Sequence, residues 1–76
     1  MTGQPAQPLR MTRGAITEIA TSHGLEFRVR GKLHVRLVET AAGCRVEHVE
    51  AGSARLLRHR SEAEQLGRRI VRMLTA

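Results

Sequence analysis

The sequence predicts a small α+β domain: a helix, then a three- to four-stranded antiparallel sheet, then a C-terminal helix, with both helices on one sheet face. Three observations lead to this fold class. Apolar residues near the N-terminus have helical spacing, the middle of the chain alternates apolar and polar residues as strands do, and the C-terminal segment returns to helical spacing. A chain of 76 residues has the length of one domain with a thin core.

The N-terminal part divides into a tail and a predicted helix. Residues 1–10 are rich in proline and glutamine and are expected to form a flexible tail, which leaves a single α+β domain over residues 11–76. Thr12 is a candidate cap for a helix over residues 13–23, and Gly24 supplies its C-terminal stop. The apolar arc of this helix consists of Ala15, Ile16, Ile19, Ala20 and His23.

The period changes from helical to alternating at Leu25, which predicts a hairpin. We expect a three-residue turn at residues 30–32, because a two-residue turn at Gly31-Lys32 would mix the apolar and polar faces. The expected pairs are Val29 with Leu33, Phe27 with Val35, and Leu25 with Leu37.

A second turn at residues 40–43 leads into a strand over residues 44–49. The expected pairs there are Glu39 with Cys44, Leu37 with Val46, and Arg36 with Glu47, the last being a favourable cross-strand charge pair. Residues 54–60 are predicted to form a short edge strand with its arginines pointing outward.

The last element is predicted from its cap and its apolar stripe. Ser61-Glu62-Ala63-Glu64 has the pattern of a capping box, in which the serine hydroxyl and the Glu64 carboxylate bind each other's backbone amides. The apolar half of the helix consists of Ala63, Leu66, Gly67, Ile70, Val71, Met73 and Leu74.

The chain is strongly basic, with thirteen basic residues against seven acidic ones and a formal net charge of +6. Lys32 is the only lysine, and guanidinium is the group best suited to bidentate binding of phosphate or carboxylate. The basic excess is greatest after residue 50. These features predict an anionic partner.

The candidate binding residues form two sets. The first covers the last strand and helix and consists of Arg55, Arg58, Arg60, Arg68, Arg69 and Arg72. The second covers the sheet and the hairpin tip and includes Arg28, Arg30 and Lys32. The chain has one aromatic residue, Phe27, so the sheet has no aromatic platform for single-stranded bases, and we expect contacts to backbone and shape.

The catalytic inventory is sparse, with four histidines, one cysteine and no aspartate. The predicted register places His34 on the polar face as a solvated residue and His48 opposite Val35 on the apolar side, so the sheet separates the two rings. Cys44 has no second thiol, and no histidine pair has helical metal-ligand spacing, so no metal or other cofactor is expected. These features favour a protein that is not an enzyme.

The predicted order of elements resembles two families. One is the double-stranded-RNA-binding domain, whose second helix begins with phosphate-binding lysines, whereas this chain has Glu62 and Glu64 there. The other resemblance is carried by residues 23–34, which look like part of the HicA-type mRNA-cleaving toxins. That family has its catalytic histidine two residues after the hairpin glycine, where this chain has Leu33.

The sequence therefore leaves three hypotheses. The first is a small basic non-enzymatic domain that binds nucleic acid or another polyanion through its arginines. The second is a protein-interaction module, such as an adaptor or inhibitor, that docks on an acidic partner. The third is a HicA-like ribonuclease toxin that uses His34. The thin core favours a homo-oligomer, and the lack of a secretory signal or an apolar span predicts a cytoplasmic protein without membrane contact.

Overall fold

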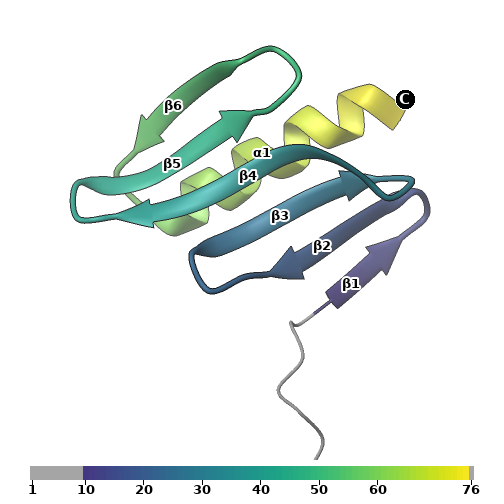
Figure 1. Ribbon diagram of the computed structural model, residues 1–76, viewed down its shortest axis with the longest axis horizontal. Coiled ribbons are helices and arrows are strands. Elements are labelled where there is room, and N and C mark those ends of the chain that lie inside the picture. Colours follow the sequence, from purple (N-terminus) through teal and green to yellow (C-terminus); the bar gives the residue numbers. More distant parts are fainter. Residues whose placement is uncertain (1–9, 76) are drawn as a thin grey trace, which may run out of the picture.

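The computed structural model describes residues 10–75, which form one antiparallel sheet with one helix packed against it, as Figure 1 shows. The six strands are neighbours in chain order: β1 (Arg10–Arg13), β2 (Ile16–Ala20), β3 (Gly24–Val29), β4 (Lys32–Thr40), β5 (Gly43–His48) and β6 (Ser53–Leu57). The helix α1 (Arg60–Thr75) follows the last strand. The predicted α+β class and C-terminal helix are confirmed. Residues 1–9, most of the predicted tail, lie outside the described residues.

The helix predicted over residues 13–23 is wrong, because this segment contains β2 and the turn before it. Ile16 and Ala20 do pack against the core as expected, but they do so from a strand. Two residues four positions apart lie on one face of a strand as well as of a helix, so their spacing does not separate the two structures. The β-branched residues of β2 favour the strand, and Gly14, with φ of +61°, provides the turn.

In the β3–β4 hairpin the predicted pairing away from the turn is confirmed, but the predicted turn is wrong. Phe27 pairs with Val35 and Leu25 with Leu37, as predicted. The turn, however, has two residues, Arg30 and Gly31, both with positive φ. A β-bulge then adds one residue to β4, so that the strands return to the predicted register beyond it. In consequence Leu33 pairs with Arg28 and Val29 with Lys32.

The remaining strand pairs agree with the sequence. The predicted pairs in β4–β5 are confirmed: Glu39 with Cys44, Leu37 with Val46, and Arg36 with Glu47. The edge strand β6 is also present, although it ends at Leu57 instead of residue 60.

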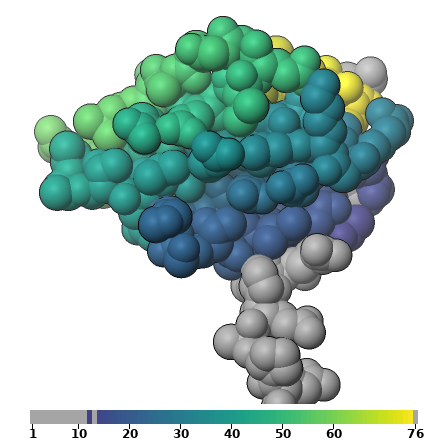
Figure 2. All heavy atoms as spheres, viewed as in Figure 1, coloured from purple at the N-terminus to yellow at the C-terminus, as the bar shows by residue number. Residues whose placement is uncertain are grey.

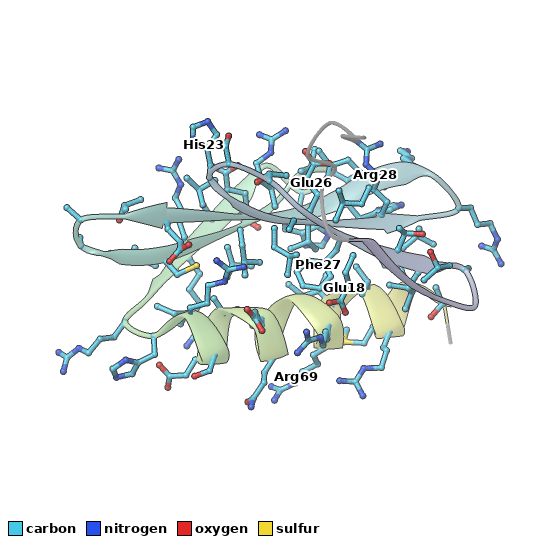
Figure 3. The ribbon with its side chains drawn as sticks, turned by 90° about the horizontal axis from the view of Figure 1, so that it is seen from below. Glu18, His23, Glu26, Phe27, Arg28 and Arg69 are labelled. Atoms are coloured by element: carbon cyan, nitrogen blue, oxygen red, sulfur yellow. The ribbon has the colours of Figure 1, made fainter. Side chains whose placement is uncertain are left out.

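The core lies between α1 and the centre of the sheet. Figure 3 shows α1 as a separate layer on one face, and α1 packs on β3, β4 and β5. The largest fully buried side chains are Phe27, Val35, Leu37 and Val71. Figure 2 looks onto the opposite face, which no helix within residues 10–75 covers. We call this the outer face.

The start of α1 differs from the predicted capping box. The helix begins at Arg60, and the amide of Ala63 donates to the carbonyl of His59 at 3.2 Å. Glu64 pairs with Arg60 instead of reaching back to Ser61. At the other end, Met73 and Leu74 were predicted in the apolar half, but they are 72% and 45% exposed. With strands in place of the first helix, the chain has the element order of neither family named above.

Candidate functional site

Arg68, a predicted binding residue, is held by the sheet. Its Nε and Nη2 atoms donate to the two carboxylate oxygens of Glu18 at 2.9 and 3.0 Å. Glu18 lies on β2 opposite Phe27, on the side that faces α1, and its side chain is 17% exposed. The hydrogen bonds to Glu18 raise the pKa of Arg68, although burial opposes them. This bidentate pair fixes the helix to the sheet and occupies the guanidinium.

Arg60 has a similar role at the start of α1. Its Nη1 atom donates to Glu39 on β4 at 2.6 Å, and its Nε atom donates to Glu64 at 2.9 Å. Partial burial lowers the pKa of Arg60, but the hydrogen bonds to Glu64 and Glu39 outweigh it and leave the pKa raised. Arg60 and Arg68 therefore connect α1 to the sheet at its first residue and at its middle.

The basic residues of the outer face are also paired with carboxylates. Arg28 lies 3.1 Å from Glu26 and donates to the carbonyl of Gly31 at 2.9 Å. Beside them, Glu47 accepts two arginines, Arg36 at 3.4 Å and Arg45 at 2.9 Å. Such surface pairs contribute little to stability, but they reduce the positive charge that this face presents to a ligand.

A smaller set of basic groups has no carboxylate partner among residues 10–75. These exposed residues are Arg30, Arg55, Arg58, Arg69 and Arg72. The Nε atom of Arg72 donates to the carbonyl of Arg68 at 3.3 Å, an acceptor that carries no net charge. Lys32 lies 3.5 Å from Glu50, with both side chains largely exposed.

The two predicted sets do not form one surface. Figure 3 shows Arg28 on the outer face and Arg69 on the far side of α1, pointing away from the sheet. The helix and the sheet lie between them. The unpaired groups on or near the helix are Arg55 on the α1 side of β6, Arg58 in the link to α1, and Arg69 and Arg72 on α1; we call them the helix-side arginines.

His48 lies opposite Val35 as the sequence predicts, but the environment of His34 differs from the prediction. His48 pairs with Val35 on the α1 side, whereas His34 lies at the bulge of β4. The expectation of a solvated His34 is wrong, because its side chain is 12% exposed and its Nδ1 atom lies 2.7 Å from Oε1 of Glu50. The carbonyl of His34 also accepts from the amide of Val49, so this histidine contacts the β5–β6 turn in two ways.

Glu18 is the residue with the clearest positional role that the sequence did not reveal. It falls outside the apolar arc of the helix predicted over residues 13–23, but in the structure it lies between Ile16 and Ala20 on the α1 side of β2. A charged residue within a stripe of apolar strand residues is the signal for a partner across the layers. Its partner is fifty positions away in the sequence, so spacing alone could not identify it.

The outer face has a depression at the β2–β3 end of the sheet. It is lined by Thr17, Ile19, Glu26, Arg28 and Gly31. The two charged residues of this lining pair with each other, and Arg28 is further held by the turn carbonyl.

No protein-family model matches the chain, and neither a curated protein nor a solved structure is significantly similar to it. Within residues 10–75, no group of three or more histidine, cysteine or acidic side chains is arranged to hold a metal ion. The helix found in that range lacks the length and apolar character that crossing a bilayer requires.

Proposed function

We propose that this protein is a small non-enzymatic domain that binds nucleic acid, or another polyanion, through the helix-side arginines. The observation that carries the proposal is the division of the arginines by ion pairing. Arg60 and Arg68, which point toward the sheet, have carboxylate partners, whereas Arg58, Arg69 and Arg72, on the solvent side, have none within residues 10–75.

The charge on the solvent side of α1 supports a polyanion as ligand. Glu62 is the exposed carboxylate of the first helical turn, and it stands against Arg69 and Arg72 on the helix and Arg58 in the link before it. Arg69 and Arg72 are three positions apart, which places them on neighbouring turns of the same flank. The helix of 16 residues is about 24 Å long, so arginines at its two ends can contact phosphates on separate parts of one backbone.

The burial of the single aromatic residue also supports a nucleic acid that is bound through its phosphate backbone. Phe27, the only aromatic residue, is fully buried, so it cannot stack on a base. Contacts that are mainly to phosphates release counterions, and the affinity therefore falls steeply with salt.

The test is a titration of fluorescent duplex DNA, duplex RNA and single-stranded RNA at several salt concentrations, followed by anisotropy. We expect binding to at least one duplex at low salt, and a double substitution, Arg69→Gln with Arg72→Gln, should reduce the salt slope by about two units. The matched control is Arg30→Gln with Lys32→Gln, which removes the same charge from the hairpin tip.

The outcomes separate the hypotheses. A loss of affinity in the Arg69→Gln, Arg72→Gln variant alone supports the helix-side arginines as the binding site. Equal losses in both variants would mean that only net charge matters and would overturn the site. No binding to any of the three nucleic acids at low salt would overturn the nucleic-acid function.

A further inference from the structure

The free edge of β6 has only part of the usual protection of an edge strand. β6 is the last strand of the sheet and pairs with β5 alone within residues 10–75, as Figure 1 shows at the edge of the sheet. The β5–β6 register runs without a bulge, and the strand contains no proline. Natural edges are protected by shortness, charged side chains, bulges, prolines or covering elements. β6 is short and contains Arg55, but it has no bulge or proline. The backbone N–H and C=O groups along the free edge of β6, on the side away from β5, are therefore available to pair with another strand.

Leu56 adds an apolar side chain to this edge. It is 53% exposed, and its pairing with Arg45 places it on the outer face of the sheet. The adjacent residues Arg55 and Leu57 pair with Val46 and Cys44, so they lie on the α1 side. A large apolar residue at the middle of an exposed edge strand is a site where a second strand can bury surface.

We propose that two copies of this chain associate through β6, in antiparallel pairing centred on Leu56. A twofold axis perpendicular to the sheet keeps the α1 side of both copies on one face. At the centre of such an antiparallel pairing, a residue lies directly opposite the same residue of the second copy. Centring on Arg55 would place two like charges directly opposite each other, which is destabilising. Centring on Leu56 instead joins two leucines on the outer face and places Arg55 opposite Leu57 of the second copy.

The alternative centre at Ala54 brings together only two small side chains and leaves Leu56 outside the paired segment. Burial of apolar surface therefore favours the centre at Leu56. The paired segment is short, and interfaces below the standard size give weak association. The dimer should accordingly form at high concentration.

This inference does not depend on the proposed binding of a polyanion, and salt distinguishes the two. Each copy carries a formal charge of +6, so the copies repel each other at low salt and screening favours the dimer. Binding to a polyanion has the opposite dependence, because salt weakens it.

The first experiment is analytical ultracentrifugation of the full chain from about 10 µM to about 1 mM, the range in which weak interfaces associate. We expect the mass to rise from 8.4 kDa toward twice that value, and to rise further at higher salt. Leu56→Lys should remain monomeric throughout. Leu74→Lys is the matched control, because Leu74 is a leucine of similar exposure at the end of α1, and it should behave as the wild type. A monomeric wild type, or equal loss in both variants, would overturn the proposal.

The second experiment tests the register through disulfide formation between copies, and it does not rely on the lysine variant. Leu56→Cys should form an intermolecular disulfide under mild oxidation at least about tenfold faster than Arg55→Cys or Ala54→Cys, because residues at the centre of the pairing face themselves. The native Cys44 is buried and gives little background. Faster linkage at Arg55 or Ala54 would overturn the register, and no linkage in any of the three would overturn the pairing.

Discussion

The backbone of Gly67 lies directly against the ring of Phe27. A Cβ atom at Gly67 would be 2.5 Å from Cε2 of that ring and 2.9 Å from Cζ. Both residues are buried, Phe27 completely. The absence of a side chain on the third turn of α1 is therefore what allows the helix to approach β3 around the only aromatic residue of the chain.

Gly67→Ala should destabilise the protein although alanine is the better helix former. Alanine gains about 1 kcal/mol in a helix interior, but overpacking of a buried ring costs about 1–3 kcal/mol, and three ring atoms are involved here. We expect a net loss of up to about 2 kcal/mol in urea unfolding, the difference between these two terms. With Phe27→Leu as background, which makes room for the new methyl group, the same substitution should cost less or stabilise. Equal effects in both backgrounds would contradict the contact.

The pair of Glu18 and Arg68 gives a second prediction. Glu18→Gln should lower the free energy of unfolding by about 1 kcal/mol, because it replaces the carboxylate of the bidentate pair and leaves Arg68 with only the more distant Glu64, at 3.6 Å. The value is modest because the Arg68 side chain is 40% exposed. A double-mutant cycle with Arg68→Gln should show coupling between the two positions. The same cycle for Arg36 and Glu47, an exposed pair at 3.4 Å, should show coupling near zero. A larger coupling there than between Glu18 and Arg68 would refute the role of the Glu18–Arg68 pair in fixing the helix to the sheet.

The sequence predicted the middle of the sheet well because two constraints agree there. Phe27, Val35, Leu37 and Val46 all lie at buried positions on the α1 face of their strands. A shift of the register by one residue would turn all of them to the other face. The oppositely charged pair of Arg36 and Glu47 supports the same register. The last helix was predicted for a similar reason, since its apolar spacing continues over several turns.

The parts of the fold that the sequence did not predict depend on contacts between residues that are distant in the chain. The segment around Ile16 and Ala20 satisfies helical and strand spacing equally, and the partner of Glu18 that decides its orientation is on α1. The candidate site was only partly accessible from sequence for the same reason. The composition shows that arginines are in excess, but Glu18, Glu26 and Glu39 determine which of them are occupied, and those partners become neighbours only in the folded chain.

The β3–β4 turn gives a third prediction. Arg30 has φ of 51° and Gly31 has φ of 84°, a conformation for which Asn-Gly is the preferred sequence. Arg30→Asn should therefore raise the free energy of unfolding by about 0.5 kcal/mol, whereas Arg30→Val should lower it by about 1 kcal/mol, because a β-branched residue is strained at positive φ. Urea midpoints measure both. A destabilising Arg30→Asn would contradict the turn, and the same variant should bind polyanions with nearly unchanged affinity if the helix-side arginines form the site.

The last prediction concerns the buried thiol of Cys44. Burial raises its pKa; Arg60 lowers it, while Glu39 and Glu64 add to the increase. The unfolded chain loses the thiol proton near pH 8.5, whereas the folded chain retains it at that pH. Because the folded state then binds more protons, stability falls as the pH rises above about 8.5, by up to about 1.4 kcal/mol per pH unit, until the folded thiol also ionises.

Cys44→Ala isolates this effect, since all other titrating groups are shared with the wild type. The variant should be less stable than the wild type at pH 7, because it removes a buried sulfur, but the difference should shrink between pH 8 and pH 10. Urea unfolding of both proteins at each pH measures it. Folded wild type should also react slowly with Ellman's reagent at pH 8, because a protonated thiol that is 2% exposed is a poor nucleophile. Parallel pH profiles for the two proteins, together with rapid labelling of the folded chain, would show that the thiol is neither buried nor protonated.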